Sequence, residues 1–165
     1  MGKLILDCLL LKQSAFEHVE EYSNFTLYSA AIVLITAICL AVGAIPLVGG
    51  FDAVSIIFAL LKWGILAGIT YALGVTILKT PKTHATIGQV ARTLGFAQLP
   101  GAFYLLGLIN PLFVLGVFIW QSWASVLAIR SALDYDRKLR ALLVWMIGVI
   151  MTAVLLTTLR DILGI

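Results

Sequence analysis

Long apolar runs alternate with short polar segments along this chain, and the runs have the length of membrane-crossing helices. The clearest runs lie at about 26–48, 53–78, 111–129 and 139–159. About 20 apolar residues in a helix cross the roughly 30 Å of hydrocarbon in a bilayer. The pattern therefore predicts an all-α fold, a polytopic membrane helical bundle that forms a single membrane domain over 1–165.

Two further segments have the spacing of amphipathic helices. Over residues 1–24, apolar side chains recur at intervals of three, four or seven, with charged residues such as Lys12 between them. Over 85–94, Val90 shares an apolar face, while Arg92 falls on the opposite face. This periodicity predicts an N-terminal amphipathic helix in the membrane interface and a second, shorter interfacial helix before the third span.

The segment 94–109 is the ambiguous one, and charge decides its topology. Basic residues near the spans fall in three segments, namely the N-terminal region, 79–92 and 130–140. These three segments share one side of the membrane only if 94–109 crosses it, as the preference for positive charge on the inside requires. We therefore predict five spans, with the N-terminus inside and the C-terminus outside.

The third predicted span is also short and imperfect. Its 16 residues from Leu94 to Ile109 rise about 24 Å as an α-helix, less than the usual hydrocarbon thickness. Pro100 removes one helical hydrogen bond and disfavours helical geometry just before it. The Gln98 amide needs a partner within the protein or a water-filled cavity. The sequence thus predicts a kinked, buried central span or a broken one.

Composition supports an integral membrane protein. The chain is 62% hydrophobic and 12% charged, about half the charge of a typical soluble domain. The basic residues form no aromatic-interleaved face, so we expect no nucleic-acid partner. Cys8 and Cys39 lack CxxC spacing and a nearby ligand cluster, so we expect no disulfide, metal or cofactor.

The sequence "LGFAQLPG" resembles the glycine–aromatic–three-residues–proline signature of the YIP (Ypt/Rab-interacting protein) membrane domain family, here carried by Gly95, Phe96 and Pro100. The stretches "THATIGQVARTLGFAQLP" and "WQSWASVLAIRSALDYDRKLRALLVWMIGV" are similar to that family's approach to the third span and to its last two spans. The longer N-terminal region of eukaryotic members is not matched, so small-GTPase binding is not carried over. The resemblance implies a compact, prokaryotic-type member in the cytoplasmic membrane.

Lys62 is the sharpest single signal, because it lies deep inside the second predicted span. Charge within a membrane is costly, and such residues have functional or paired roles unless they snorkel to the surface. Gln98, Asn110 and Gln121 are candidate partners. A functional role and snorkelling both remain open from the sequence.

Other polar or small residues have two interpretations each. The "GILAG" sequence beginning at Gly64 forms a small-xxx-small face that suits close packing within the chain or a homo-oligomer. Gln121 and Ser122 form a polar patch for hydrogen bonds between helices or for a substrate path. Arg130 and Asp134 belong to a polar loop that is either simply solvated or a docking site for a membrane or cytosolic protein partner.

No catalytic motif is present: the sequence has no HExxH, no GxSxG, no phosphate-binding glycine loop and no carboxylate pair within a span. We expect a protein that is not an enzyme. The YIP resemblance implies a membrane scaffold or adaptor that organises the lipid bilayer or partner proteins. The alternative is a small oligomeric transporter or channel that uses Lys62 and the broken third span.

Overall fold

The computed structural model describes residues 1–164, and all of their regular secondary structure is helical. The helices, in chain order, are α1 (Gly2–Leu9), α2 (Gln13–Glu21), α3 (Phe25–Gly43), α4 (Ile45–Val48), α5 (Val54–Val75), α6 (Ile87–Phe96), the 3₁₀-helix η1 (Leu99–Leu108), α7 (Leu112–Ala132) and α8 (Lys138–Leu163).

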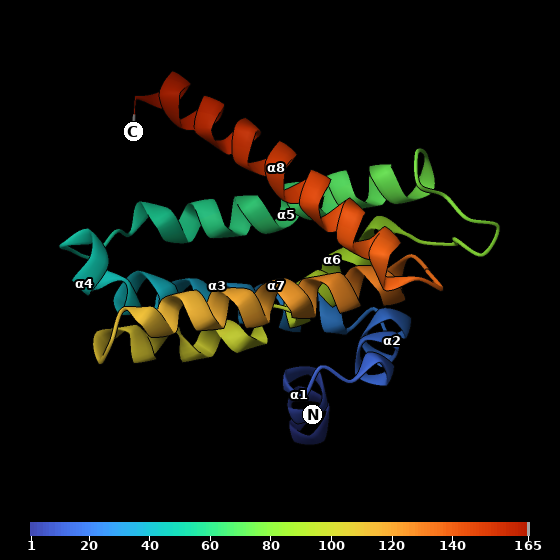
Figure 1. Ribbon diagram of the computed structural model, residues 1–165, viewed down its shortest axis with the longest axis horizontal. Coiled ribbons are helices and arrows are strands. Elements are labelled where there is room, and N and C mark those ends of the chain that lie inside the picture. The colour runs from blue at the N-terminus through green and yellow to red at the C-terminus, as the bar shows by residue number, and fades with distance from the viewer. Residues whose placement is uncertain (165) are drawn as a thin grey trace.

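Four helices run along the length of the bundle, as Figure 1 shows. Helices α3, α5, α7 and α8 are each long and apolar enough to cross a membrane. At about 1.5 Å per residue, the 19 residues of α3 already approach the thickness of the hydrocarbon layer. The all-α class is thus confirmed, together with four spanning helices at the positions predicted for the first, second, fourth and fifth spans.

The third predicted span, 94–109, is not one spanning helix. It consists of the end of α6 and the ten-residue η1. Pro100 occupies one of the first two positions of η1. Because Pro100 has no backbone N–H to donate, the α-helical ladder stops just before it. A 3₁₀-helix rises about 2.0 Å per residue rather than 1.5 Å, so η1 covers more length than the α-helix assumed from the sequence. The prediction of a broken segment is confirmed. The expected burial of this segment holds for only one side of η1, which packs on α3 and α7, whereas Phe103, Leu105 and Leu108 on its other side are exposed.

The N-terminal segment differs from the single interfacial helix predicted over 1–24. The helix is interrupted between α1 and α2, where Leu11 adopts a left-handed backbone conformation with φ of 59°. Phe16 and Val19 on α2 are fully buried in a cluster with Phe96 and Leu127. The apolar face of α2 therefore packs on α6 and α7 instead of lying in lipid. The periodicity of the sequence indicates that this face is apolar, but it does not indicate whether protein or lipid covers it.

The short helix predicted over 85–94 is present as α6, but it packs among other helices and does not lie with its apolar face in lipid. A capping box between Thr86 and Gln89 begins α6, and α6 then lies among α2, α3, α5 and α7. Arg92, expected on the exposed face, is only 8% exposed and donates to the Glu20 carbonyl oxygen at 2.7 Å. The C-terminal end of α2 covers the polar face of α6, and Glu20 also accepts a hydrogen bond from Gln89 Nε2 at 3.2 Å.

Glycines allow the central segment to approach α3 very closely. Gly101, Tyr104 and Gly107 are buried along one side of η1, because residues three apart eclipse one another in a 3₁₀-helix. A Cβ atom on Gly101 would lie 2.9 Å from the Thr36 Cβ, and one on Gly107 would overlap the Gly43 carbonyl oxygen. The close packing of η1 on α3 thus depends on these glycines.

The predicted small-xxx-small face on α5 does not take part in such packing. A Cβ atom on Gly64 or Gly68 would meet no heavy atom within 4 Å. The interpretation of "GILAG" as a packing surface within the chain is therefore wrong, because the neighbouring helices contact other faces of α5. The structure contains one chain, so the homo-oligomer remains a prediction.

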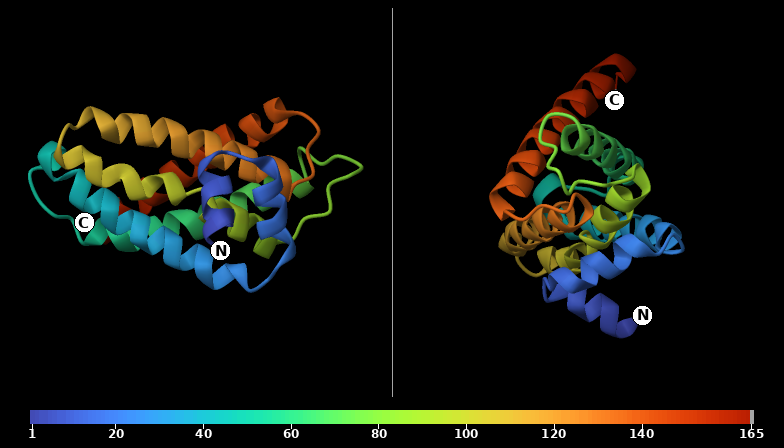
Figure 2. Two further views of the ribbon diagram at one scale, coloured as in Figure 1. Left: turned by 90° about the horizontal axis from the view of Figure 1, so that it is seen from below. Right: turned by 90° about the vertical axis from the view of Figure 1, so that its right-hand side faces the viewer.

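The apolar core is concentrated in one half of the bundle. A cluster that includes Leu66, Leu94, Val126 and Ile129 joins α5, α6, α7 and α8, whereas a much smaller cluster lies nearer to α4. The C-terminal half of α8 diverges from the other helices (Figures 1 and 2). The half of the bundle nearer to α4 is consequently the less densely packed one.

Candidate functional site

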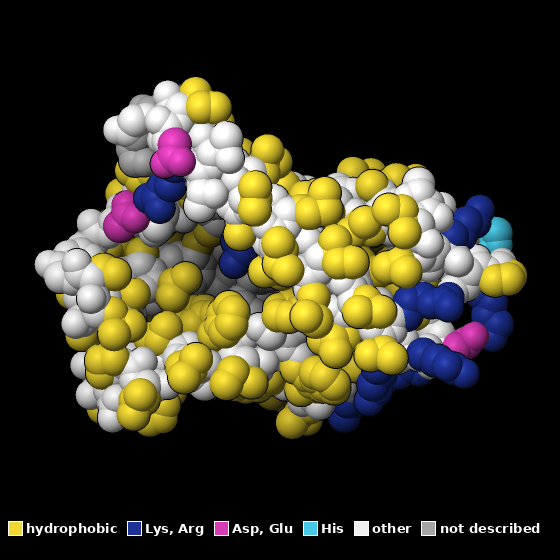
Figure 3. Space-filling model, turned by 45° about the horizontal axis from the view of Figure 1, so that its top comes forward, with side chains coloured by type: hydrophobic (Ala, Val, Ile, Leu, Met, Phe, Trp, Pro, Cys, Tyr) yellow, Lys and Arg dark blue, Asp and Glu magenta, His cyan; other side chains and the backbone are white. Residues whose placement is uncertain are grey.

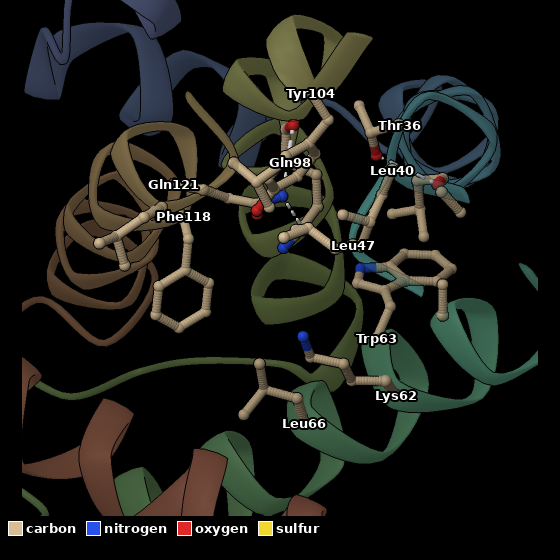
Figure 4. Close-up of a pocket in the computed structure, with 15 residues that line it drawn as sticks. Thr36, Leu40, Leu47, Lys62, Trp63, Leu66, Gln98, Tyr104, Phe118 and Gln121 are labelled. Atoms are coloured by element: carbon tan, nitrogen blue, oxygen red, sulfur yellow. Dashed lines mark hydrogen bonds between the residues drawn. The ribbon is translucent and has the colours of Figure 1, made fainter. Parts of the chain in front are cut away.

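A cavity of about 430 Å³ lies in this less densely packed half, between α3, α5, η1 and α7. Most of its lining is apolar, and three of its polar lining residues are Lys62, Gln98 and Gln121. The sequence had singled out all three, although they come from separate helices and the short connection between α6 and η1. Figure 4 shows how they point towards one another. The structure thus brings three sequence candidates into one site.

The polar groups on one wall of the cavity form a connected chain of hydrogen bonds. The Tyr104 hydroxyl donates to Gln121 Oε1 at 2.7 Å, and Gln121 Nε2 donates to Gln98 Oε1. Gln98 Nε2 in turn donates to the Leu94 carbonyl oxygen at 3.4 Å. The partner that the sequence required for the Gln98 amide is therefore found within the protein, partly on the carbonyl groups near the break in the helix.

Lys62 contributes the charge of the site. Its amine points into the cavity from α5 (Figure 4), about 12 Å along the helix from Val54 at a rise of 1.5 Å per residue. Within residues 1–164, no hydrogen bond or ion pair engages this amine, and no carboxylate lines the cavity. The third proposed partner, Asn110, lies elsewhere and accepts a hydrogen bond from the Leu112 N–H at 2.9 Å.

Tyr104 and Trp63 belong to the site, but the sequence had not assigned them a role there. Both line the cavity, and the Trp63 indole donates to the Ala91 carbonyl oxygen at 2.9 Å, which fixes α5 against α6. A sequence signal for Tyr104 existed: it stands midway between Gly101 and Gly107 at the three-residue spacing of a 3₁₀-helix. Reading that signal required knowing that η1 is not an α-helix.

The residues that carry the family resemblance build the central segment and do not line the cavity. Gly95 packs against Ser29, whose hydroxyl donates to the Arg92 carbonyl oxygen at 2.9 Å. Phe96 is 1% exposed and its ring lies edge-on to Phe25, with centroids 5.5 Å apart. Together with Pro100 at the start of η1, these residues position Gln98 rather than touch a ligand.

Ser122 does not extend the polar patch predicted around Gln121. Its hydroxyl donates to the Phe118 carbonyl oxygen at 2.8 Å, and the neighbouring Ser125 donates to the Gln121 carbonyl oxygen at 2.9 Å. Both bonds stay within α7, because a serine in a helix can bond the carbonyl four residues earlier. Of this patch, only the Gln121 side chain bonds to another segment.

Arg130 and Asp134 form part of a separate, charged hollow at the other end of the bundle. The hollow has a volume of about 550 Å³ and is lined by Gln13, Glu17, Lys82, Arg130, Ser131, Asp134, Tyr135 and Asp136. The Arg130 guanidinium donates to the carbonyl oxygens of Tyr135 at 3.1 Å and Asp136 at 3.3 Å. Lys82 forms an ion pair with Asp136 at 3.0 Å. These bonds hold the 133–137 turn in one shape, in which Asp134 has φ of 51°.

The charges of this hollow act on a carboxyl group of α2, that of Glu20. Burial, together with the negative charges of Asp134 and Glu17, raises the pKa of Glu20 to about 7. Arg92 lowers the pKa, with a smaller effect than burial. The charged end therefore contains one carboxyl group that changes its protonation near neutral pH.

Four apolar helices of spanning length around a broken central segment define a polytopic helical membrane protein. The model of the Yip1 domain matches residues 12–158. The chain therefore belongs to the Yip1 domain family, which confirms the resemblance inferred from Gly95, Phe96 and Pro100. No curated protein and no solved structure matches the chain.

Proposed function

We propose that this protein is a non-catalytic membrane adaptor of the YIP type that binds a partner protein at its charged end. The observation that supports this function is the charged hollow around Arg130 and Asp134. Three segments distant in sequence build it, namely α2, the 76–86 connection and the α7–α8 turn. A preformed polar surface of this kind is suited to recognition by charge complementarity.

The charges of the hollow indicate the chemistry of the partner. The cations of Lys82 and Arg130 are engaged within the protein, whereas the Asp134 carboxylate has no hydrogen bond or ion pair to any part of the chain that the structure describes. Glu17 accepts one hydrogen bond from Gln13 at 2.9 Å. The free acceptors are thus carboxylate oxygens, which suit a partner segment with lysine or arginine side chains.

The proposed orientation places this end in the cytoplasm of a prokaryotic cell, with five crossings of the cytoplasmic membrane. Basic side chains gather at the end of the bundle opposite α4 (Figure 3), whereas Arg160 pairs with Asp52, 3.8 Å away, near the α4 end. This asymmetry supports an inside location of the basic end. A cysteine at position 134, in a variant with Cys8 and Cys39 replaced, should react with an impermeant thiol reagent only in inverted vesicles.

Site-specific cross-linking in the native membrane tests the adaptor function. A photoreactive residue at position 13, which lines the hollow, should capture a distinct partner, and the additional change Asp134→Lys should abolish that capture. A photoreactive residue at position 51, exposed near α4, is the matched control. Equal capture at positions 51 and 13, or capture that survives Asp134→Lys, would contradict the proposal.

The alternative function is a small oligomeric transporter or channel, and one observation favours it. Lys62, Gln98 and Gln121 meet in one cavity, as polar groups in transport sites do. An apolar cluster fills the half of the bundle nearer the charged end, and Leu66 belongs to this cluster as well as to the cavity lining. The cavity therefore ends at a packed core, which argues against a continuous path for a solute. Transport predicts a solute flux into liposomes that Lys62→Met abolishes without affecting insertion. Absence of flux for wild-type protein that still captures its partner excludes this alternative.

A further inference from the structure

The cavity at Lys62 opens sideways onto the apolar surface of the bundle. Four of its lining side chains are also on the surface, with Leu40 38% exposed, Leu47 56%, Leu115 58% and Phe118 48%. Figure 3 shows a hollow in this apolar face with a basic side chain inside it. Because exposed apolar side chains on a spanning bundle face lipid, the opening connects the cavity with the membrane and not only with water.

The interior of the cavity favours a negative charge. The Lys62 ammonium group presents three N–H donors and remains exposed to the opening, with no carboxylate among the lining residues. The amide oxygens of Gln98 and Gln121 already accept hydrogen bonds from within the protein. An unpaired cation at this depth is costly, and an anion beside it would form a strong, charge-assisted hydrogen bond.

The cavity also has the length and size for a ligand that enters from the membrane surface. It extends from Leu47 in α4 to Leu66, three turns beyond Val54 in α5. Its volume of about 430 Å³ lies within the range of about 300–1,000 Å³ found for small-molecule sites. A helix from a second chain is about 10 Å wide and offers no charge to Lys62 unless it carries a carboxylate.

We propose that this cavity binds the anionic headgroup of a membrane phospholipid from the leaflet on the α4 side. The phosphate group accepts hydrogen bonds from Lys62, and the acyl chains leave through the opening along Leu115 and Phe118. The polar wall of Gln98, Gln121 and Tyr104 replaces part of the headgroup's hydration. This site goes beyond the adaptor function and is independent of the charged end.

Lipid retention measured by native mass spectrometry tests the site. Protein purified with equal amounts of phosphatidylglycerol and phosphatidylcholine of identical acyl chains should retain the anionic lipid preferentially. Lys62→Met should lower this preference at least about tenfold, as expected for the loss of a hydrogen bond to a charged group. Lys62→Arg should keep it. Lys79→Met, which removes the same charge from the 76–86 connection, should keep it as well.

A second variant separates loss of the site from loss of the fold. Ala59 lines the cavity, so Ala59→Phe fills the cavity while Lys62 stays in place, and it should also reduce retention. Thermal unfolding verifies that each variant is folded.

Several results would overturn the assignment: equal retention of both lipids by wild-type protein, an unchanged preference in Lys62→Met, or an equal loss in Lys79→Met. Lys62-dependent binding of inorganic phosphate without lipid, or a Lys62-dependent dimer, would assign the cavity to another occupant. Any of these leaves the adaptor proposal intact, because capture at position 13 does not involve this cavity.

Discussion

Gly95 is the position where the structure predicts the sharpest effect of a single methyl group. In Gly95→Ala the new Cβ would overlap the Ser29 Cβ and lie 3.0 Å from both the Cα and the Oγ of Ser29. These atoms belong to or adjoin the α3 backbone and cannot rotate away as the end of a long side chain can. The methyl group must therefore push α6 away from α3.

The expected magnitude follows from three contributions. Overpacking in a dense core destabilises by about 1–3 kcal/mol, and weakening the hydrogen bond from the Ser29 hydroxyl to the Arg92 carbonyl oxygen adds about 1 kcal/mol. Alanine offsets this by about 1 kcal/mol, because it favours a helix over glycine. The net loss in the free energy of unfolding is about 2 kcal/mol, which corresponds to a decrease in Tm of about 4–8 °C for a chain of this size.

The chain provides its own assay and its own control. Cys8 and Cys39 are both free and buried, so a thiol-reactive fluorophore reports unfolding in detergent without any added label. Gly68→Ala places the same methyl group in a helix where no heavy atom lies within 4 Å. That variant should raise Tm slightly, since only the helix-propensity gain of about 1 kcal/mol remains.

The two variants should therefore change Tm in opposite directions. If Gly95→Ala unfolds at or above the wild-type temperature, the close contact between α6 and α3 is not present. Ser29→Gly removes the Cβ that the new methyl group meets. The double variant Gly95→Ala/Ser29→Gly should consequently lose less stability than the sum of the two single changes.

Three further variants test the site and the N-terminal docking, two by thermal unfolding and one by hydrogen exchange. Tyr104→Phe removes the hydrogen bond to Gln121 and should lower stability by about 1 kcal/mol; an unchanged Tm would mean that the bond contributes nothing. The pKa of Glu20 is raised from 4.5 to about 7 in the folded protein, so the folded state holds this proton more tightly than the unfolded state. The resulting stabilisation is fully present at pH values below 4.5 and is lost as the pH rises to about 7. Stability should fall as the pH rises towards 7, and Glu20→Gln should flatten this fall; a pH profile identical to wild type would refute the assignment. Arg92→Met removes the bond to the Glu20 carbonyl oxygen and should speed hydrogen exchange in α2, whereas unchanged exchange would show that α2 docks through its apolar face alone.

The four long apolar helices were predictable because lipid imposes them, whereas the predicted fifth span is not a long helix. A spanning segment must satisfy its backbone internally and remain apolar for about 20 residues, and α3, α5, α7 and α8 obey this rule in the sequence itself. The break before Pro100 was predictable for a similarly local reason, since proline removes a backbone donor wherever it stands. Gly95, Phe96 and Pro100 likewise sufficed to indicate the family.

Amphipathic periodicity, by contrast, shows that a helix has an apolar face but not what covers that face. Val90 and Phe16 gave the pattern expected at a lipid surface, yet both are buried against protein. Arg92 gave the pattern of a solvated side chain, yet its partner is a carbonyl group 72 residues away. Such long-range pairings depend on how the helices pack, which no local spacing encodes.

The sequence by itself determined a helical membrane protein of the Yip1 family, with one lysine inside a spanning segment and one interrupted segment. Only the tertiary structure decided that these two features belong together, because a cavity forms where α5 stands apart from α7 and η1 presents Tyr104 and the adjoining Gln98 to it. The physical reason is that hydrophobicity and proline chemistry act locally, whereas a cavity is the space left by four separate segments. That space is what places Lys62 beside Gln98, Tyr104 and Gln121.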